Sequence, residues 1–353
     1  MPAFLYVVVP CYDECASLPA THATLMALLD ELAGQRRIAA ASRVLYVDDG
    51  STDDTLAVLE RYAAKDQRIR IINAPHNCGL QWARHRGIKA AQGQWIMFVD
   101  ADDFITEDYV MRMHSGIAQT GADAAMSSMN YNVRKRLPFL HMPKHTRFAH
   151  FAGKTISQKE FREQYLPQFM GIRNIYAAVW AWIYRRYLFQ GYELPEVRSF
   201  QGEDLLFNAT ILPRARKISG IDCCGYYYRG GGFSKPIGQD MEQWWSLYHE
   251  QCRVIKENDL PEACYSHSAI FLITELHWFI QKRLIAQHDP AIIRHDLAAE
   301  LQRPEWGEVV ELAEETDPTG FVRLVRQGDA DAIIKFNRRL IPPRWKIWIH
   351  RLL

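Results

Sequence analysis

Three aspartates directly follow an apolar run and are the residues of this chain best suited to chemistry. The run covers residues 95–99, and Asp100, Asp102 and Asp103 come after it. A short apolar run that ends in an acidic turn predicts a buried strand. Carboxylates spaced Asp-x-Asp can hold one hard divalent cation, such as Mg²⁺ or Mn²⁺, and leave coordination positions for phosphate oxygens. The alternative is an acidic turn that caps a helix from Thr106 onward, and these residues alone do not separate the two.

Two more polar turns follow apolar runs nearer the start of the chain. Pro10-Cys-Tyr-Asp-Glu14 follows the first run, and Asp48-Asp-Gly-Ser-Thr52 follows the second. Ligands of open α/β sheets bind at the carboxyl ends of the strands, so we expect all three turns on one rim. A repeated strand, turn and helix pattern must position them and predicts a parallel sheet. The expected strands are 5–9, 44–47, 68–72 and 95–99, with helices after Asp53 and from about 81 to 91.

Length and composition restrict the class of protein. The 353 residues indicate two domains or one domain with a long extension. The net charge of +1 predicts no nucleic-acid partner. The sequence has no apolar run of about 18 residues and no signal-peptide pattern, so we expect a cytoplasmic protein without a spanning helix. The seven cysteines, an odd number, are then expected to be reduced thiols.

Two common nucleotide-binding motifs are missing from the sequence. Neither GxGxxG nor GxxxxGK[ST] occurs after a predicted strand. This argues against a dinucleotide-dependent dehydrogenase and against a P-loop ATPase. If the protein binds phosphates, a metal ion is then the expected means of neutralising them.

The polar turns belong to a longer series of ordered segments. They are Val9-Pro-Cys-Tyr-Asp-Glu14, Val47-Asp-Asp-Gly-Ser-Thr52, Asn77-Cys-Gly-Leu-Gln-Trp-Ala-Arg84, Gly87-Ile-Lys-Ala-Ala-Gln-Gly93, Phe98-Val-Asp-Ala-Asp-Asp103, Trp180-Ala-Trp-Ile-Tyr-Arg185, Gly202-Glu-Asp-Leu-Leu-Phe207, and Tyr226-Tyr-Tyr-Arg229 with Ser234. In order and spacing the series resembles the family 2 glycosyltransferases of GT-A fold, of the bacterial surface-polysaccharide type. The resemblance covers roughly the first two thirds of the chain. It implies inverting transfer from a nucleotide-sugar donor with Mn²⁺ or Mg²⁺.

The resemblance implies a donor site built from the first two turns. Pro10 and Tyr12 would line the base pocket, Glu14 would stand beside them, and Asp49 would accept a hydrogen bond from the base. A carboxylate accepts hydrogen bonds but cannot donate one, and this suits the N3–H of uracil. We therefore expect a UDP-sugar as donor.

The same resemblance gives roles to the acidic turn and to one arginine. Asp100 would lie near the ribose and Asp102 would bind the metal, while Asp103 is expected to cap a helix. Arg84 would lie near the diphosphate, with a surface arginine on a helix as the alternative.

The resemblance also implies a catalytic base and an acceptor surface. Asp204 would remove the proton of the acceptor hydroxyl as it attacks the sugar. Glu203, Trp180 and Trp182 are candidates for contacts with the acceptor. Without the resemblance, Glu203 and Asp204 would be interpreted as the cap of the following helix. Trp182 also replaces a lysine that the family usually carries. A Gln-x-x-Arg-Trp motif, typical of processive members, is missing, so we expect one sugar per encounter.

The predicted architecture is a doubly wound, mostly parallel GT-A sheet of the α/β class with a helical C-terminal extension. Residues 1–105 would bind the nucleotide sugar, residues 106–232 would hold the acceptor and the base, and residues 233–353 would form the extension. The alternatives to transfer onto a surface glycan or lipid-linked oligosaccharide are transfer to a polyprenyl phosphate and a non-catalytic nucleotide-sugar-binding subunit.

Two basic segments are open to more than one interpretation. Residues 131–151 are predicted to form a loop that either grips an anionic acceptor or is solvated. The tail, residues 335–353, combines basic with aromatic residues. It is predicted either to dock on an anionic membrane surface, which would make the protein peripheral on the inner face of the cell membrane, or to pack on the protein as a helix.

Overall fold

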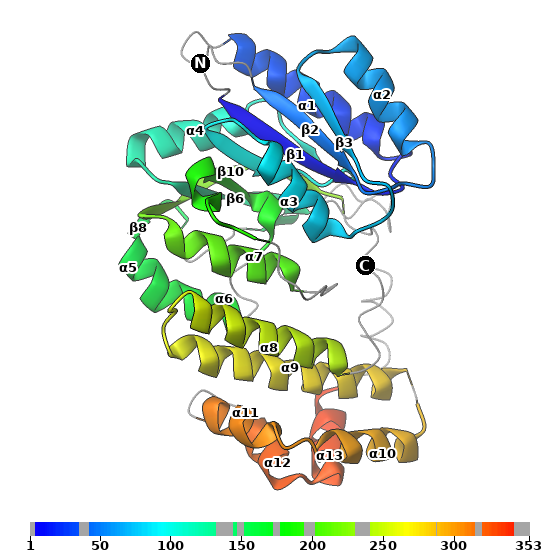
Figure 1. Cartoon of the computed structure of the whole chain (residues 1–353). Helices are drawn as coiled ribbons and strands as arrows, with labels where there is room; N and C mark the ends of the chain where they lie inside the picture. The colour runs from blue at the N-terminus through cyan, green and yellow to red at the C-terminus, as the bar shows by residue number, and fades with distance from the viewer. Residues whose placement is uncertain are drawn as a thin grey trace. The chain divides into compact units, whose positions relative to one another are not determined.

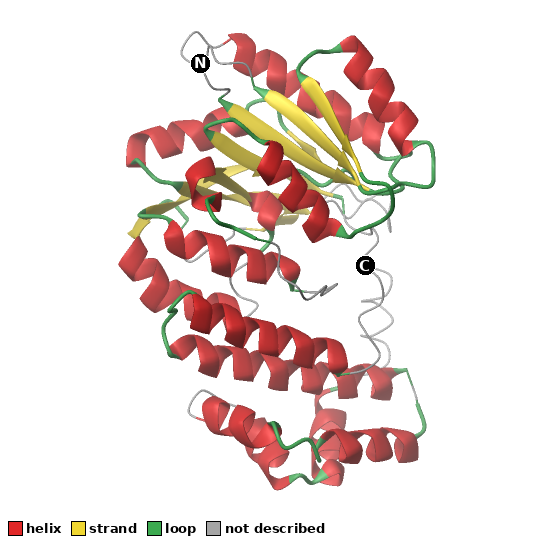
Figure 2. Cartoon of the chain, in the orientation of Figure 1, coloured by secondary structure: helices red, strands yellow, loops and turns green. Residues whose placement is uncertain are grey.

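The structure is a computed structural model in two compact units. It describes residues 4–34, 42–131, 144–146, 152–171, 177–193, 202–229, 241–286, 288–314 and 320–341. Unit 1 is drawn from 1–161, 176–198 and 210–233, and unit 2 from 162–175, 199–209 and 234–353. The sheet belongs to unit 1, and the described part of unit 2 is helical (Figures 1 and 2).

Unit 1 is built on one mixed sheet. Its order is β3-β2-β1-β4-β9-β6-β10-β5, with β7 added beside β6 and β8 beside β10. The first four neighbours are parallel, as predicted, and β10 runs parallel to β6, whereas β9, β5, β7 and β8 pair antiparallel. The strands are β1 (Leu5–Cys11), β2 (Arg43–Asp48), β3 (Ile69–Asn73), β4 (Trp95–Phe98), β5 (Phe104–Ile105), β6 (Ala124–Tyr131), β7 (Lys144–Thr146), β8 (Thr155–Ser157), β9 (Trp182–Arg185) and β10 (Lys217–Tyr228).

Helices cover both faces of the parallel part of this sheet. Gly87 of α3 (Leu80–Ala90) lies against Val8 of β1. His22 of α1 (Leu18–Gly34) bonds to Tyr46, which is in register with Val9. Successive residues of a strand point to opposite faces, so α3 and α1 lie on opposite sides of the sheet, as Figure 1 also shows. Strands buried on both faces must be apolar throughout, and β1 is buried along its whole length.

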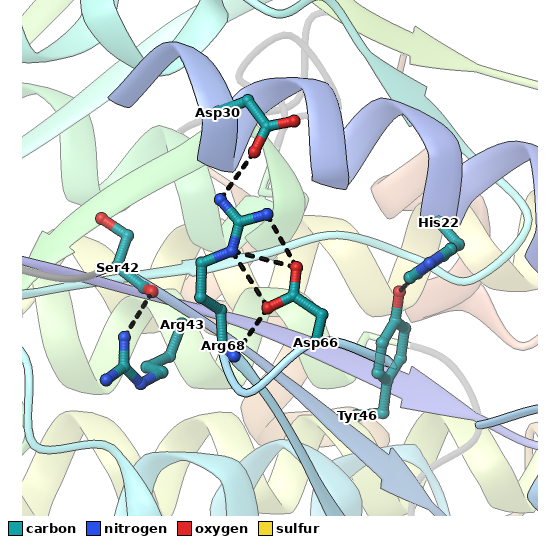
Figure 3. A network of polar contacts seen from close by, with 7 residues as sticks. All are labelled: His22, Asp30, Ser42, Arg43, Tyr46, Asp66 and Arg68. Carbon is teal, nitrogen blue, oxygen red and sulfur yellow. Dashed lines mark hydrogen bonds and ion pairs between the residues drawn. The ribbon is translucent and has the colours of Figure 1, made fainter. Parts of the chain in front are cut away.

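Polar contacts join α1 to β2 and to the segment between α2 (Thr55–Lys65) and β3 (Figure 3). The Arg68 guanidinium lies 2.7 Å from Asp30 of α1 and 2.7 Å from Asp66, which follows α2. Closer to the start of α1, the His22 Nδ1 is 2.9 Å from the Tyr46 hydroxyl, and the His22 ring stacks on Tyr62 of α2 at 3.6 Å. These contacts fasten the two helices of this face to the sheet and to each other.

Further helical segments accompany the sheet of unit 1. α4 (Tyr109–Thr120) packs on β10 and β6. Three short 3₁₀ segments lie at Val179–Ala181, Arg186–Phe189 and Leu212–Arg214. A one-turn helix, α5 (Gln158–Glu160), begins after Ser157, whose hydroxyl accepts the Glu160 N–H, and it runs into a π-helical turn, Phe161–Tyr165. Of the predicted basic loop at 131–151, all but the backbone of Tyr131 and of β7 lies outside the described residues.

Unit 2 is a helical bundle with an aromatic core. Trp245 packs edge-on against Trp306 at 4.9 Å and donates its indole N–H to Glu300 at 2.6 Å. The burial of the Glu300 carboxyl beside these rings raises its pKa. The predicted helical C-terminal extension is confirmed over the described residues of this part of the chain, and α8 and α9 are its first two helices there. The helices are α6 (Leu166–Gly171), α7 (Glu203–Ile211), α8 (Glu242–Glu257), α9 (Ala263–Ile285), α10 (Pro290–Glu300), α11 (Trp306–Ala313), α12 (Phe321–Gln327) and α13 (Ala330–Leu340).

The first residues of the basic tail, 335–340, form the second half of α13. This helix buries Ile333, Ile334 and Asn337, and it contacts α9, α10 and α12. The basic side chains of Lys335, Arg338 and Arg339 are exposed on its other face. The packed helix is therefore confirmed as far as Leu340, and residues 342–353 lie outside the described part. Among the described residues, no helix has the length and apolar character that crossing a membrane requires.

Candidate functional site

The carboxyl ends of β1 and β4 are the position at which the topology of this sheet favours ligand binding. The chain passes from β1 to β2 and β3 on one side, whereas β4 lies on the other side of β1. Such a reversal leaves a crevice at the carboxyl ends of the strands. β1 pairs with β4 only as far as Val8, while its pairing with β2 continues through Pro10 to Cys11. Pro10 therefore stands where β4 has parted from β1, and the backbone N–H that proline lacks is not needed there.

The turn after β1 is locked to the turn after β2. The Asp13 carboxylate accepts the backbone N–H of Thr52 at 2.7 Å, and the Glu14 N–H donates to the Thr55 hydroxyl at 2.9 Å. Asp13 has a φ of 53°, a left-handed conformation that aspartate tolerates better than most residues. These bonds leave Tyr12 half-exposed on the rim, and Glu14 is half-exposed beside it with its carboxylate accepting the Ser17 hydroxyl.

The Asp49 side chain is buried and is held by two hydrogen bonds, which its place in a polar turn does not indicate. Its side chain is 3 % exposed, and its two oxygens accept the backbone N–H groups of Cys78 at 2.8 Å and Gly79 at 2.7 Å. Burial raises the pKa of Asp49, and the two N–H donors counteract part of that rise. A carboxylate has about four lone-pair positions, so Asp49 keeps capacity to accept another hydrogen bond.

Arg84 and Asp100 face each other at the rim. The Arg84 guanidinium is 3.7 Å from the Asp100 carboxylate, and the arginine side chain is 3 % exposed against 26 % for the aspartate. The alternative of a surface arginine on a helix is therefore wrong. Arg84 stands on the inner side of α3, so its positive charge is held against the carboxyl end of the sheet, where the Asp100 carboxylate partly neutralises it.

Asp103 does not cap a helix. Its side chain is fully buried, and its carboxylate accepts the Tyr226 hydroxyl at 2.8 Å and the Arg229 backbone N–H at 2.8 Å. The short strand β5 follows, and the helix expected from Thr106 onward is α4, which begins later, at Tyr109, with Asp108 as its N-cap residue. Burial, together with the nearby Asp100 carboxylate, raises the pKa of Asp103 to about 8. The buried Asp103 side chain thus links the acidic turn to the end of β10 by hydrogen bonds.

The acidic turn can serve a cation only in part. Within the described residues, no three His, Cys, Asp or Glu side chains converge as a ligand set. Asp102 is half-exposed, and its carboxylate makes no polar contact with another described residue. Oxygen ligands of this kind suit Mg²⁺ and Mn²⁺, and Mg²⁺ commonly takes one or two carboxylates together with substrate phosphate and water. The residues fit a cation that a bound phosphate helps to hold.

The two tryptophans expected at the acceptor surface are buried. Trp182 of β9 is fully buried, and Trp180 is 3 % exposed. The Trp180 ring stacks on Tyr226 at 4.4 Å and on Tyr228 at 5.6 Å. In this arrangement both indole rings are packed against neighbours, which favours a supporting role for Trp182 over direct contact with a ligand.

Glu203 and Asp204 open α7 and belong to unit 2. Gly202 precedes them with a φ of 82°, and a Cβ there would lie 2.5 Å from the Leu247 side chain. Both side chains belong to the first helical turn, where the helix dipole favours negative charge, and both residues are half-exposed, although the Glu203 Oε2 atom is buried. Their position agrees with the alternative interpretation of both residues as the start of a helix.

Sequence inspection missed the residues that hold the acidic turn. The Thr21 hydroxyl lies 2.8 Å from the Ala101 carbonyl oxygen and 2.6 Å from that of Asp103. The Arg229 side chain donates to the carbonyl oxygen of Asp102. Tyr226 and Arg229 belong to one of the ordered sequence motifs, but Thr21 lies in the first turn of α1 with no local signal.

Comparisons with known proteins show the family of the chain. The family model for glycosyl transferase family 2 matches residues 6–191. The uncharacterized glycosyltransferase EpsJ of Bacillus subtilis (strain 168) is 31% identical over 189 residues, which are 53% of this chain and 52% of that protein. The putative glycosyltransferase EpsH of the same organism is 28% identical over 258 residues, 66% of this chain and 68% of that protein. This chain thus covers about half the length of EpsJ and about two thirds of EpsH.

Solved structures share the fold. The crystal structure of S. aureus TarS 1–349 aligns with a TM-score of 0.63 at 20% identity, covering 97% of this chain and 93% of that one. The same TarS fragment in complex with UDP-GlcNAc aligns with a TM-score of 0.63 at 21% identity, covering 95% of this chain and 90% of that one. At these identities the likeness shows the fold alone. Because the family model spans more than half of the chain, the chain belongs to glycosyl transferase family 2.

Proposed function

We propose that the protein transfers one sugar from a UDP-sugar to a hydroxyl of a surface glycan or lipid-linked oligosaccharide, with inversion and with a divalent cation. The observation that supports this proposal is the pairing of Arg84 with Asp100 at 3.7 Å directly after β4, with Asp102 in the same turn and Asp49 directly after the parallel strand β2. Unit 1 would bind the donor. TarS, which shares the fold, has been crystallised with UDP-GlcNAc, and this supports the choice of a UDP-sugar.

The nucleotide would occupy the crevice beside β1. Tyr12 is half-exposed there and can stack on a base, and Asp49 has acceptor capacity for a base N–H. Pro10 would contribute a rigid wall and Glu14 a second carboxylate near the turn. Arg84 carries the positive charge that a diphosphate needs, and a charge-assisted hydrogen bond from a guanidinium is about twice as strong as a neutral one.

Asp102, aided by Asp100, would hold the cation. When bound, Mn²⁺ or Mg²⁺ would neutralise the charge that develops on the leaving diphosphate. The mannosyltransferase PcManGT from Pyrobaculum calidifontis, described in complex with GDP-Man and Mn²⁺, aligns with a TM-score of 0.50 at 14% identity. That likeness concerns the fold, so the cation at Asp102 rests on the chemistry of the carboxylates.

Asp204 would act as the general base and Glu203 would orient the acceptor. Inversion needs one group to take the proton of the attacking hydroxyl on the face opposite the leaving nucleotide. Asp204 is a half-exposed carboxylate at a helix start, which suits this task. Trp180 would support the acceptor surface through Tyr228, on which its ring stacks.

The exposed face of α13 would assist docking at an anionic membrane surface, on the cytoplasmic side. Lys335, Arg338 and Arg339 are exposed there beside Leu340, which is 51% exposed. Such a face would place the enzyme near a lipid-linked acceptor.

The experiment that tests the proposed function measures nucleotide release. Purified protein is incubated with UDP-, GDP- and dTDP-sugars and Mn²⁺, and the free nucleotide diphosphate is followed. We expect release of UDP that excess EDTA abolishes, and NMR of the product should show the inverted anomer. Release of another nucleotide, or release that EDTA does not reduce, would overturn the donor or the metal assignment respectively.

A further inference from the structure

We infer that Thr21 and Tyr226 are positioning residues, which hold the backbone of the acidic turn so that Asp102 presents its carboxylate to a cation and diphosphate. The inference rests on the proposed function and assigns roles to two residues outside the donor-binding set. It starts from the observation that every residue from 100 to 103 is tied to another element through its main chain.

Four main-chain atoms of the turn have partners from elsewhere in unit 1. The Asp100 N–H donates to the Tyr226 hydroxyl at 3.2 Å. The carbonyl oxygens of Ala101 and Asp103 share the proton of the Thr21 hydroxyl, at 2.8 Å and 2.6 Å. The carbonyl oxygen of Asp102 accepts from the Arg229 side chain. The turn is thus clamped between α1 on one side and the end of β10 on the other.

Both positioning hydroxyls are themselves fixed. Thr21 is fully buried and also receives the Arg229 guanidinium at 3.3 Å. Tyr226 is fully buried, its ring is stacked on Trp180 at 4.4 Å, and its hydroxyl donates to the Asp103 carboxylate at 2.8 Å. A hydroxyl held by packing and by a second hydrogen bond has little freedom to move, so it also restricts the main-chain atoms of the turn to which it bonds.

An irregularity in β10 brings Tyr226 to this place. Ile221 is in register with Ser127 and Tyr226 with Met129, so residues 222–225 of β10 lie opposite Ser128 alone. Such a bulge redirects the side chains that follow it. Gly225 within the bulge accepts the Thr106 N–H through its carbonyl oxygen at 2.8 Å, which also joins β10 to the segment after the acidic turn.

The groups that hold the acidic turn in place differ from the group that would bind the cation. The turn is held by main-chain atoms and by the Asp103 side chain, whereas the Asp102 carboxylate makes no polar contact with another described residue. Partners that orient a metal-binding carboxylate commonly change metal affinity by about 10- to 100-fold when they are removed. Loss of either hydroxyl should therefore act on the cation through Asp102, without removing any ligand.

The test compares Mn²⁺ binding in the presence of UDP across matched variants. Y226F and T21V each remove one hydroxyl and keep the side-chain shape, and T21S keeps the hydroxyl. Y227F is the control for the tyrosine, because Tyr227 is the next residue of β10 and stacks on Phe104. T24V is the control for the threonine, because the Thr24 hydroxyl bonds only within α1. Free Mn²⁺ is measured by electron paramagnetic resonance, and the unfolding midpoint is measured for every variant.

We expect the Mn²⁺ dissociation constant to rise about tenfold or more in Y226F and T21V, at a temperature well below their unfolding midpoints. T21S, Y227F and T24V should keep the wild-type value. Wild-type affinity in a folded Y226F or T21V would overturn the inference, even if the unfolding midpoint falls. If Y226F does not fold, T21V against T21S decides. D102A separates the two hypotheses, because wild-type Mn²⁺ binding that D102A leaves unchanged would overturn the metal assignment and the inference together.

Discussion

The Asp49 carboxylate accepts the backbone N–H of Gly79 at 2.7 Å, directly before the first turn of α3. Together with the Cys78 N–H at 2.8 Å, this bond ties the turn after β2 to the turn after β3. The carboxylate expected to recognise the base therefore also supports the loop that leads to Arg84. A substitution here should affect both the stability of unit 1 and donor binding.

We predict that D49N lowers both the free energy of unfolding and the affinity for UDP. Asparagine offers one oxygen and one NH₂ group, so one of the two backbone N–H groups would face another donor. An unsatisfied buried group of this kind costs about 1–3 kcal/mol in the free energy of unfolding. Urea unfolding measures this cost, and calorimetry with UDP measures the loss of affinity. D54N is the control, because Asp54 makes no side-chain cap bond at the start of α2. Unchanged UDP affinity in a destabilised D49N would leave Asp49 with a structural role only.

We predict that D102A abolishes Mn²⁺-dependent turnover. Removing this carboxylate takes away the main protein anchor for the cation, and the diphosphate would then remain poorly neutralised. The unfolding midpoint should change little, because the Asp102 side chain bonds to no other described residue. Nucleotide release over a range of Mn²⁺ concentrations is the measurement. Full activity in D102A would move the cation elsewhere.

We predict that D204N separates donor binding from chemistry. The amide keeps the shape of the carboxylate but cannot take a proton, so transfer should fall by about 10² or more. Donor affinity, measured by calorimetry, should stay at the wild-type value. E203Q provides the comparison at the neighbouring position and should lose less activity. Loss of donor affinity in D204N, parallel to the loss of rate, would place Asp204 in the donor site instead.

We predict that His22 contributes a loss of stability as the pH drops below about 6.5, the ordinary histidine value, against an opposite contribution from Asp103, whose raised pKa makes the folded protein bind the extra proton. Burial lowers the pKa of His22, whose Nδ1 contacts the Tyr46 hydroxyl. At His22 the folded protein then binds fewer protons than the unfolded chain in this range, so this group favours unfolding in acid. H22Q should reduce the slope of the unfolding free energy against pH. It should not remove the slope, because burial lowers the pKa of His85, His114 and His277 as well. An unchanged slope in H22Q would assign the effect to the other three.

We predict that the exposed basic face of α13 contributes to binding of anionic liposomes. R338E/R339E reverses two exposed charges and leaves the buried Ile333, Ile334 and Asn337 in place. Each basic residue near an anionic surface contributes about 1 kcal/mol, so co-sedimentation at low salt should fall strongly. R61E/K65E makes the same change in charge on the exposed surface of α2 and is the control. Truncation after Ile341 tests residues 342–353 without removing α13. Equal co-sedimentation of all these proteins would contradict a membrane role.

The sequence determined the parallel part of the sheet and the chemistry available at its edge. Strands buried on both faces need unbroken apolar runs, and such runs are visible without knowledge of the fold. The predicted strands at 5–9, 44–47, 68–72 and 95–99 agree with β1 to β4 to within two residues at each end. Acidic and polar residues placed directly after such runs are also local features, which is why Asp49, Asp100 and Asp102 could be named in advance.

The tertiary structure alone decided how these residues are held. Asp103 bonds to Tyr226, 123 residues away, and the Asp103 carbonyl oxygen bonds to Thr21, 82 residues away. No local pattern encodes such pairs, because they depend on how α1 packs and on where the bulge in β10 falls. The same reason explains the wrong prediction of a helix cap at Asp103 and the burial of Trp180 and Trp182. A carboxylate or an indole can be recognised from the sequence, but its exposure is set by the surrounding packing.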